Sequence, residues 1–262
     1  MLMAAQIILH IPHASDYIPC MDGYLVDRGQ LFNEIMHLTD WYTDDLFDLQ
    51  FPKIIAQFSR VFCDVERFAD DSAEVMSQCG MGMCYTHFDD GRLMRVVTPE
   101  LRERIKKNYY DPHHRQLEKL VDESLANHGK ALIIDCHSFP DIPLERDLQK
   151  NLPRPDFCIG TNDFHTPPSI AGYAYEYFAN KGYDVRFNDP YSGTVIPKKF
   201  YRTERNVCGI MIEVNRKLYM HHDQNGISRS SDYKKISILI KEFLKDFSSQ
   251  THPLRTDHRL IV

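Results

Sequence analysis

Three short apolar runs dominate the hydrophobic pattern of the chain, and each leads to a residue with a chemically active side chain. The runs cover residues 5–11, 131–136 and 208–214. They are rich in β-branched and aliphatic residues and too short for buried helices, so they predict central strands of a parallel sheet. The first run leads to His13, the second to His137, and the third carries Glu213 near its end. Since the carboxyl ends of parallel strands form one edge of an open sheet, we expect these side chains to meet there.

The remaining pattern predicts further strands alternating with helices. Strands are expected at residues 53–58, 61–65, 157–159 and 183–187, and helices at about 28–50, 99–128, 167–181 and 231–247. Pro112 is expected to kink or split the second helix, and Gly129 to end it. Residues 69–98 lack a clear period and predict a long loop, which in a compact domain tends to be functional.

The order of these elements predicts a single α/β domain over residues 1–262. We expect a mostly parallel mixed sheet with helices on both faces, because no internal repeat or linker divides the chain. The polar tail after about residue 248 is expected to be loose.

Composition narrows the classes of function. The chain has 262 residues, of which 43% are hydrophobic, and a formal net charge of −6. No basic stripe is present, which argues against a nucleic-acid partner. No apolar run is long enough for a membrane span, and the start has no signal-peptide pattern. Seven scattered cysteines, an odd number, favour reduced thiols in the cytoplasm. The oligomeric state is left open.

The histidines and carboxylates are compatible with a catalytic zinc ion. Such an ion takes three protein ligands and leaves one position for water, whose pKa it lowers to about 7. His13, Asp40 and His137 would supply this set, with Glu213 as the base, and Asp44, one helical turn after Asp40, is a rival ligand. Spacing alone leaves a structural role open, since no recognised zinc signature is present and Asp40 and Asp44 would also suit a solvated helix face. Glu213 is harder to explain structurally, because a carboxylate in an apolar run is costly unless paired.

Seven short segments, in this order along the chain, together resemble the N-formylglutamate amidohydrolase family. They are Ile11-Pro12-His13-Ala14-Ser15, Thr39-Asp40-Trp41-Tyr42-Thr43-Asp44, Ser59-Arg60, Asp64-Val65-Glu66-Arg67, Asp135-Cys136-His137-Ser138, residues 155–161, and residues 213–220. The resemblance implies a zinc-dependent amidohydrolase related to carboxypeptidases, with a phosphorylase/hydrolase-like α/β fold.

By this resemblance, His13, Asp40 and His137 hold the zinc ion and Glu213 carries the proton chemistry. The chain departs from the family pattern in places: Ala14-Ser15 stands where the family usually has Ser-Gly, Tyr42 where it often has His, and Asp64-Val65-Glu66-Arg67 where it has Asp-Leu-Asn-Arg. These departures leave the hydrolytic residues in place and leave the acyl group and amino acid open.

A small acidic N-acyl amino acid, the substrate that the resemblance implies, needs cationic partners for its carboxylates. Arg60 and Arg67, which resemble the family's arginines, and Arg216 are the candidates, because guanidinium groups bind carboxylates in a bidentate way. Each could instead pair with a local carboxylate such as Asp64. Gly193-Thr194 would offer backbone N–H groups to the substrate, or only form a turn.

Other histidines and cysteines receive mainly structural interpretations. His113, His114 or Tyr110 on the long helix would stabilise an oxyanion if they reached the site, although helix histidines are more often surface residues. His10 is interpreted as structural. The group formed by Cys79, Cys84 and His87 lacks a fourth zinc ligand and is interpreted as packing.

Three functions compete at this point. The leading hypothesis is a metal-dependent amidohydrolase acting on N-formylglutamate or a relative. The second is a thiol hydrolase that uses Cys136 beside His137, a poor geometry because adjacent strand residues face opposite sides. The third is a non-catalytic protein that binds a small acidic ligand or another protein.

Overall fold

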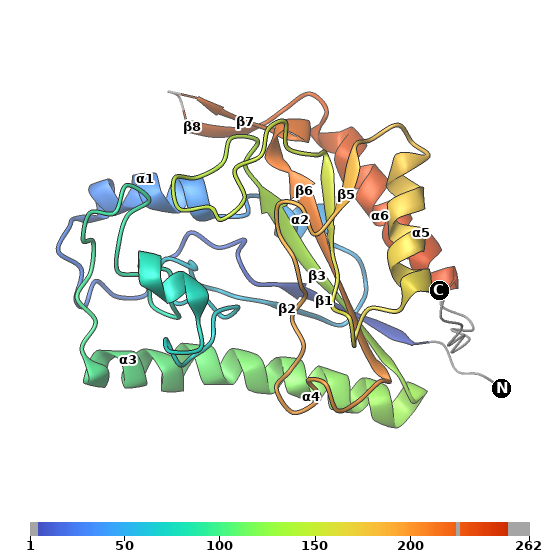
Figure 1. The fold of residues 1–262 in the computed structure, drawn as a ribbon, viewed down its shortest axis with the longest axis horizontal. Coiled ribbons are helices and arrows are strands. Elements are labelled where there is room, and N and C mark those ends of the chain that lie inside the picture. Colours follow the sequence, from blue (N-terminus) through green and yellow to red (C-terminus); the bar gives the residue numbers. More distant parts are fainter. Residues whose placement is uncertain (1–4, 224–225, 251–262) are drawn as a thin grey trace.

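The computed structural model describes residues 5–223 and 226–250, and these form a mixed α/β fold around a six-stranded sheet (Figure 1). The strand order is β2-β1-β3-β6-β4-β5. The strands are β1 (Gln6–Ile11), β2 (Lys53–Ile55), β3 (Ala131–Phe139), β4 (Phe157–Gly160), β5 (Val185–Phe187) and β6 (Val207–Asn215).

The sheet is mostly parallel, as predicted. Strands β2, β1, β3 and β6 run parallel to one another, while β4 pairs antiparallel with β6 and parallel with β5. The two central strands, β3 and β6, are nine residues long and buried along their whole length. Burial on both faces explains why their sequences read as continuous apolar runs.

Helices cover both faces of the sheet, so the predicted fold class is confirmed. Alternate residues of β3 point to opposite faces: Leu132 and Ile134 join one core cluster, Ala131 and Ile133 another. Helices α5 (Pro168–Ala179) and α6 (Tyr233–Gln250) pack on the first of these faces, and α4 (Asp111–His128) on the second (Figure 1). A third cluster lies beside the sheet, between α1 (Arg28–Leu38), α3 (Pro99–Ile105) and the intervening loops.

The helix predicted at residues 28–50 is wrong, since two helices with a break between them occupy this stretch. They are α1, which begins at an Asp27 capping box, and the short α2 (Thr43–Leu46). In the break, the Asp40 N–H donates to the His13 carbonyl oxygen at 2.9 Å, and Tyr42 is left-handed with φ 65°. Asp40 is therefore held by the loop that follows β1, instead of lying on a helix face.

The helix predicted at residues 99–128 is continuous but widened at its centre. Between α3 and α4 lies a π-helical turn, η2 (Lys106–Tyr110), and Pro112 stands in the first turn of α4. A proline ring clashes with the carbonyl four residues earlier, and the wide turn relieves that clash. The chain therefore stays helical across Pro112 and does not split there, and the helix ends at Gly129, as predicted, with φ 68°.

One detail of the turn-rich region differs from the sequence predictions, and another agrees. The strand expected at residues 61–65 is absent from the described chain, because the Ser59 carbonyl accepts from the N–H groups of Phe62 and Cys63 and so forms tight turns. Their side chains are buried in the lateral cluster without strand alternation. The loop at 69–98 is confirmed, with one short 3-10 helix, η1 (Val75–Cys79).

The C-terminal part adds a small hairpin that the sequence did not predict. A 3-10 turn, η3 (Arg216–Leu218), follows β6 and leads into the antiparallel pair β7 (Met220–Asp223) and β8 (Gly226–Arg229). Helix α6 then continues to Gln250, and the expected loose tail falls mostly on residues 251–262, outside the described part. Among the described helices, none has the length and apolar character to cross a bilayer.

His165 fastens the loop before β6, and its hydrogen bonds require a neutral ring. Its Nδ1 lies 2.7 Å from the Val207 carbonyl oxygen, and its Nε2 accepts from the Arg202 N–H at 2.8 Å. Nδ1 must therefore carry the proton and Nε2 must not. Burial lowers the pKa of His165 below its usual 6.5, in agreement with this tautomer.

We expect His165→Gln to lower the free energy of unfolding by about 1–3 kcal/mol at pH 7.5, the usual cost of leaving a buried partner unsatisfied. The difference should shrink as pH falls below about 6.5, since the unfolded wild-type chain then binds a proton that the folded ring resists. Urea unfolding of both proteins between pH 7.5 and 5.5 measures this. An equal difference at every pH would contradict the neutral-ring interpretation.

Candidate active site

The side chains that the sequence singled out do meet at the carboxyl edge of the sheet. His13 lies two residues beyond the end of β1, His137 lies in β3, and Glu213 lies in β6. His137 and Glu213 are register partners in neighbouring parallel strands, so their side chains stand side by side on the face covered by α4. All three residues are buried.

Glu66 joins this group, although no separate role was predicted for it. One ligand atom from each of His13, Glu66 and His137 can be chosen so that all lie within 4.8 Å of one another. Glu66 Oε2 lies 3.1 Å from His137 Nε2 and 3.8 Å from His13 Nδ1. Glu66 comes from the turn-rich segment after Asp64. Because a strand was wrongly predicted at residues 61–65, the direction of its side chain could not be foreseen. We refer to His13, Glu66 and His137 as the central cluster.

The ring of His13 is oriented by Asp64 and presents its other nitrogen to the cluster. His13 Nε2 lies 2.9 Å from Asp64 Oδ1. His13 Nδ1 is buried and has no hydrogen-bond partner within residues 5–223 and 226–250. A buried ring nitrogen without a partner is costly, so its direction toward Glu66 and His137 needs an explanation.

Asp40 orients the second histidine of the cluster. Its Oδ2 lies 3.0 Å from His137 Nδ1 and 3.7 Å from His13 Nδ1, and its Oδ1 accepts from Arg216 at 2.9 Å. Although burial would raise the pKa of Asp40, contacts with both histidines and with Arg216 lower it, so the carboxylate stays ionised. The groups that could share an ion contain Glu66 and do not contain Asp40. The geometry thus favours Asp40 as the partner of a ligand, and Asp44, the rival, is exposed on α2.

Asp64 is the hub of a buried charge network that also occupies Arg60. Besides His13, it accepts hydrogen bonds from Arg60 at 3.0 Å and from the Tyr85 hydroxyl at 2.7 Å. Burial would raise the pKa of Asp64, but the charges of Arg60 and His13 hold it well below its usual range. The alternative that Arg60 pairs with the local Asp64 is therefore present in the structure.

Arg67 has an unpaired buried donor beside this network. It lies next to Glu66 in the chain and 3.8 Å from Asp64. Its Nε is buried without a hydrogen-bond partner in the described part of the chain. The segment is fixed from behind, because the Tyr110 hydroxyl donates to the Arg67 carbonyl oxygen at 2.9 Å.

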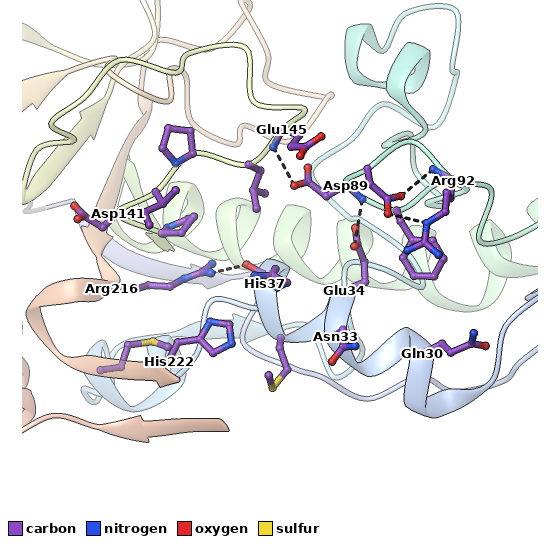
Figure 2. Close-up of a pocket in the computed structure, with 18 of the residues that line it drawn as sticks. Gln30, Asn33, Glu34, His37, Asp89, Arg92, Asp141, Glu145, Arg216 and His222 are labelled. Atoms are coloured by element: carbon purple, nitrogen blue, oxygen red, sulfur yellow. Dashed lines mark hydrogen bonds and ion pairs between the residues drawn. The ribbon is translucent and has the colours of Figure 1, made fainter. Parts of the chain in front are cut away.

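Arg216 binds the carboxylate oxygen of Asp40 that does not contact His137, and it also lines a large cavity. It donates to Asp40, to the Ser138 hydroxyl and to the His37 carbonyl oxygen. Figure 2 shows Arg216 extending toward His37 at one end of a cavity of about 720 Å³, whose wall also includes His222 and Glu34. Arg216 therefore links the wall of this cavity to Asp40, which contacts His137 of the central cluster.

Glu213 has the properties of a proton-transfer group. Burial raises the pKa of Glu213 to about 8, while nearby His137 opposes the shift. Its Oε2 is buried without a hydrogen-bond partner among the residues described. Carboxyl groups with pKa values shifted toward neutrality are common in active sites, because such groups exchange protons readily there.

The loop at residues 189–195 approaches the site through a contact with Asp135. Gly193 has φ 93°, so a turn role explains this glycine. The Val195 N–H donates to Asp135 Oδ2 at 2.9 Å, which ties the loop to the base of the cluster. The Thr194 hydroxyl is buried and unpaired among the described residues. In this loop, Val195 is thus the residue with a hydrogen bond to Asp135, and Gly193 and Thr194 directly precede it in the chain.

The structure gives the surroundings of three further histidines. His10, interpreted as structural, bonds to Asp135 at 2.7 Å and to His113 of α4 at 2.8 Å, and all three side chains are buried. His113 thus reaches the edge of the site from the helix. Its neighbour His114 packs against Tyr110, with the ring centroids 4.2 Å apart and the rings tilted by 43°.

The comparison with known proteins agrees with the fold and covers nearly the whole chain. The chain is 24% identical over 256 residues to an N-formylglutamate deformylase of Pseudomonas aeruginosa and 23% identical over 259 residues to one of Pseudomonas putida. Each alignment covers 91% of this chain and 91% of the relative.

Two solved structures have the same fold. The crystal structure of N-formylglutamate amidohydrolase from Ralstonia eutropha JMP134 superposes with a TM-score of 0.82 at 22% identity, over 95% of each chain. A gene product of Agrobacterium tumefaciens gives a TM-score of 0.63 at 18% identity, over 95% of this chain and 91% of the other. The model of the N-formylglutamate amidohydrolase family matches residues 5–220. The chain therefore belongs to the N-formylglutamate amidohydrolase family.

Proposed function

We propose that this protein hydrolyses the amide bond of N-formylglutamate, or of a closely related small N-acyl amino acid, with the help of a bound zinc ion. The observation that carries this proposal is the His13 Nδ1 atom, which is buried and unpaired in the described chain and lies 3.8 Å from Glu66 Oε2, in the group that His137 completes. The names of the two Pseudomonas relatives, both N-formylglutamate deformylases, support the choice of substrate.

The donor set of the central cluster fits a zinc ion. His13 Nδ1, Glu66 and His137 Nε2 would hold it, since two imidazoles and one carboxylate are a common catalytic zinc set. The outward nitrogens of both histidines already contact carboxylates, Asp64 and Asp40, which is the usual support of zinc-binding histidines. When bound, zinc supplies Lewis acidity and makes water a nucleophile near neutral pH. This assignment replaces Asp40, our sequence-based ligand, with Glu66.

Glu213 would transfer the proton in this reaction. Its free carboxylate oxygen takes a proton from the attacking water as the water oxygen bonds to the formyl carbon. The protonated Glu213 then gives that proton to the amide nitrogen as the C–N bond breaks, and formate and the amino acid leave. Because burial raises the pKa of Glu213, the proton is held firmly enough to be carried between the two steps.

Arg67 is the first choice for binding a substrate carboxylate. Its guanidinium has an unpaired buried Nε, and about 21% of its side chain is exposed. Arg60 and Arg216 already serve Asp64 and Asp40, so they would act mainly by holding those carboxylates in place. Backbone N–H groups of Gly193 and Thr194 remain candidates to contact the acyl group, since their loop borders the site.

The thiol-hydrolase hypothesis receives no support from the geometry. Cys136 lies in the core cluster on the sheet face opposite His137, and it is fully buried. Burial raises the pKa of the Cys136 thiol well above its usual value, which disfavours the nucleophilic thiolate. The seven cysteines are all unpaired in the structure, which supports a reducing compartment such as the cytoplasm.

We expect purified protein to contain about one tightly bound zinc and to release formate from N-formylglutamate. A chelator should abolish turnover and added zinc should restore it, whereas a thiol-blocking reagent should leave it unchanged, because the partly exposed Cys20 and Cys79 are not among the site residues. Elemental analysis and a screen of N-formyl and N-acetyl amino acids measure these outcomes. Protein without metal or turnover would support a non-catalytic binding role, and loss of activity with the thiol reagent alone would favour a cysteine mechanism.

A further inference from the structure

We propose that Glu66 bridges two metal positions, the second formed by His10, Asp135 and the outer oxygen of Glu66. This inference rests on the proposed function, because it adds a second divalent cation to the same site. One ligand atom from each of His10, Glu66 and Asp135 can be chosen so that all lie within 4.8 Å of one another. The first position, formed by His13, Glu66 and His137, satisfies the same condition.

The two oxygens of Glu66 are divided between the two groups. Oε2 faces the first group, 3.1 Å from His137 Nε2 and 3.8 Å from His13 Nδ1. Oε1 faces the second group, 3.5 Å from His10 Nδ1. A carboxylate with one oxygen toward each of two ligand sets has the arrangement of the bridging ligand in two-metal hydrolases.

Asp135 is placed to serve the second position. Its Oδ1 lies 2.7 Å from His10 Nδ1 and 3.1 Å from His137 Nε2, between the two groups. Its Oδ2 accepts the Val195 N–H, which fixes the orientation of the carboxylate. Burial would raise the pKa of Asp135, but the adjacent histidines His137 and His10 hold it well below its usual range.

His10 has the outer contact that a metal-binding histidine needs. Its Nε2 lies 2.8 Å from His113 Nε2, so His113 can accept the Nε2 proton while His10 Nδ1 points at Asp135 and Glu66. The position between His10 Nδ1 and Asp135 can hold either a shared proton or a divalent cation, because metal ions displace ligand protons. The contact with His113 then fixes the tautomer in which Nδ1 is free to bind.

The contact between His10 and His113 comes from the widened turn before α4. The π-helical turn η2 ends at Tyr110, three residues before His113. Such turns shift the phase of the helix that follows and often lie at functional sites. Here the helix delivers a buried imidazole to His10, while Tyr110 fixes the main chain at Arg67, next to Glu66.

The stoichiometry of the wild-type protein tests this inference without any substitution. Apoprotein titrated with Mn²⁺ or Co²⁺ should bind two equivalents, the second more weakly than the first. Because ions that share a carboxylate lie about 3.5–4 Å apart, electron paramagnetic resonance should then show the two spins coupled. Saturation at one equivalent, with turnover intact, would overturn the second position and leave the proposed function standing. No bound metal at all would overturn both.

Two variants assign the second equivalent to its ligands. His10→Asn should bind one equivalent and lose the spin coupling, since it removes a ligand of the second position only. His114→Asn is the matched control: it replaces a partly buried histidine next to His113 that belongs to neither group, and it should still bind two equivalents. Circular dichroism of each variant should be measured to check that it is folded. Two equivalents in folded His10→Asn would overturn the assignment to His10.

Discussion

Replacing Glu213 by Gln should lower kcat by about a hundredfold or more while the bound metal is retained. The substitution keeps the shape of the side chain but removes the carboxylate that exchanges the proton, and general acid–base catalysis typically contributes this much. Glu213 is absent from both groups that could share an ion, so metal content should not change. Steady-state kinetics and elemental analysis of the same preparation measure the two effects separately.

The pH profile provides an independent check of this assignment. Since the base must be ionised, kcat/KM of the wild type should fall as pH decreases through the pKa of Glu213, which burial raises well above the ordinary 4.5. A bound cation pulls this pKa downward, so the acidic limb should lie below about 8 in the metal-loaded enzyme. In the Gln variant this limb should disappear. Unchanged turnover, or the same acidic limb in the variant, would show that another group is the base.

The central sheet could be predicted because its signal is local. Runs such as residues 131–134 are apolar at every position, and strands buried on both faces have that pattern. The hydrophobic period around residues 28–50 wrongly predicted one continuous helix. It carries no information on the hydrogen bond that the Asp40 N–H donates to the loop after β1. The break there is a tertiary effect that propensity cannot reveal.

Part of the candidate site could also be predicted from local sequence patterns, and part could not. His13, His137 and Glu213 follow or end apolar runs, so strand prediction alone brings them to one edge. Glu66 was missed because it comes from an irregular segment, where no periodicity says which way a side chain points. The one available signal was its place in the Asp64–Arg67 segment, between a carboxylate and an arginine that both became site residues.

Glu66→Gln and Asp40→Asn should separate a metal ligand from its supporting carboxylate. Both substitutions replace a carboxylate by an amide of the same shape, and both residues contact His137. Glu66 lies in the group that could hold the ion, so its variant should lose metal and turnover together. Asp40→Asn should keep the ion with an affinity lowered by about 10–100-fold, the usual cost of losing the partner of a metal-binding histidine.

Competition with a chromophoric chelator measures both affinities, and thermal unfolding with and without zinc gives a second readout. A protein that binds zinc only when folded is stabilised by it, so added zinc should raise the Tm of Asp40→Asn but scarcely that of Glu66→Gln. The opposite ranking, with Asp40→Asn losing the ion and Glu66→Gln retaining it, would return Asp40 to the ligand set that the sequence suggested. Equal loss of zinc in both variants would mean that Asp40 does more than support His137. The Asp40–Arg216 pair would then be needed to assemble the cluster.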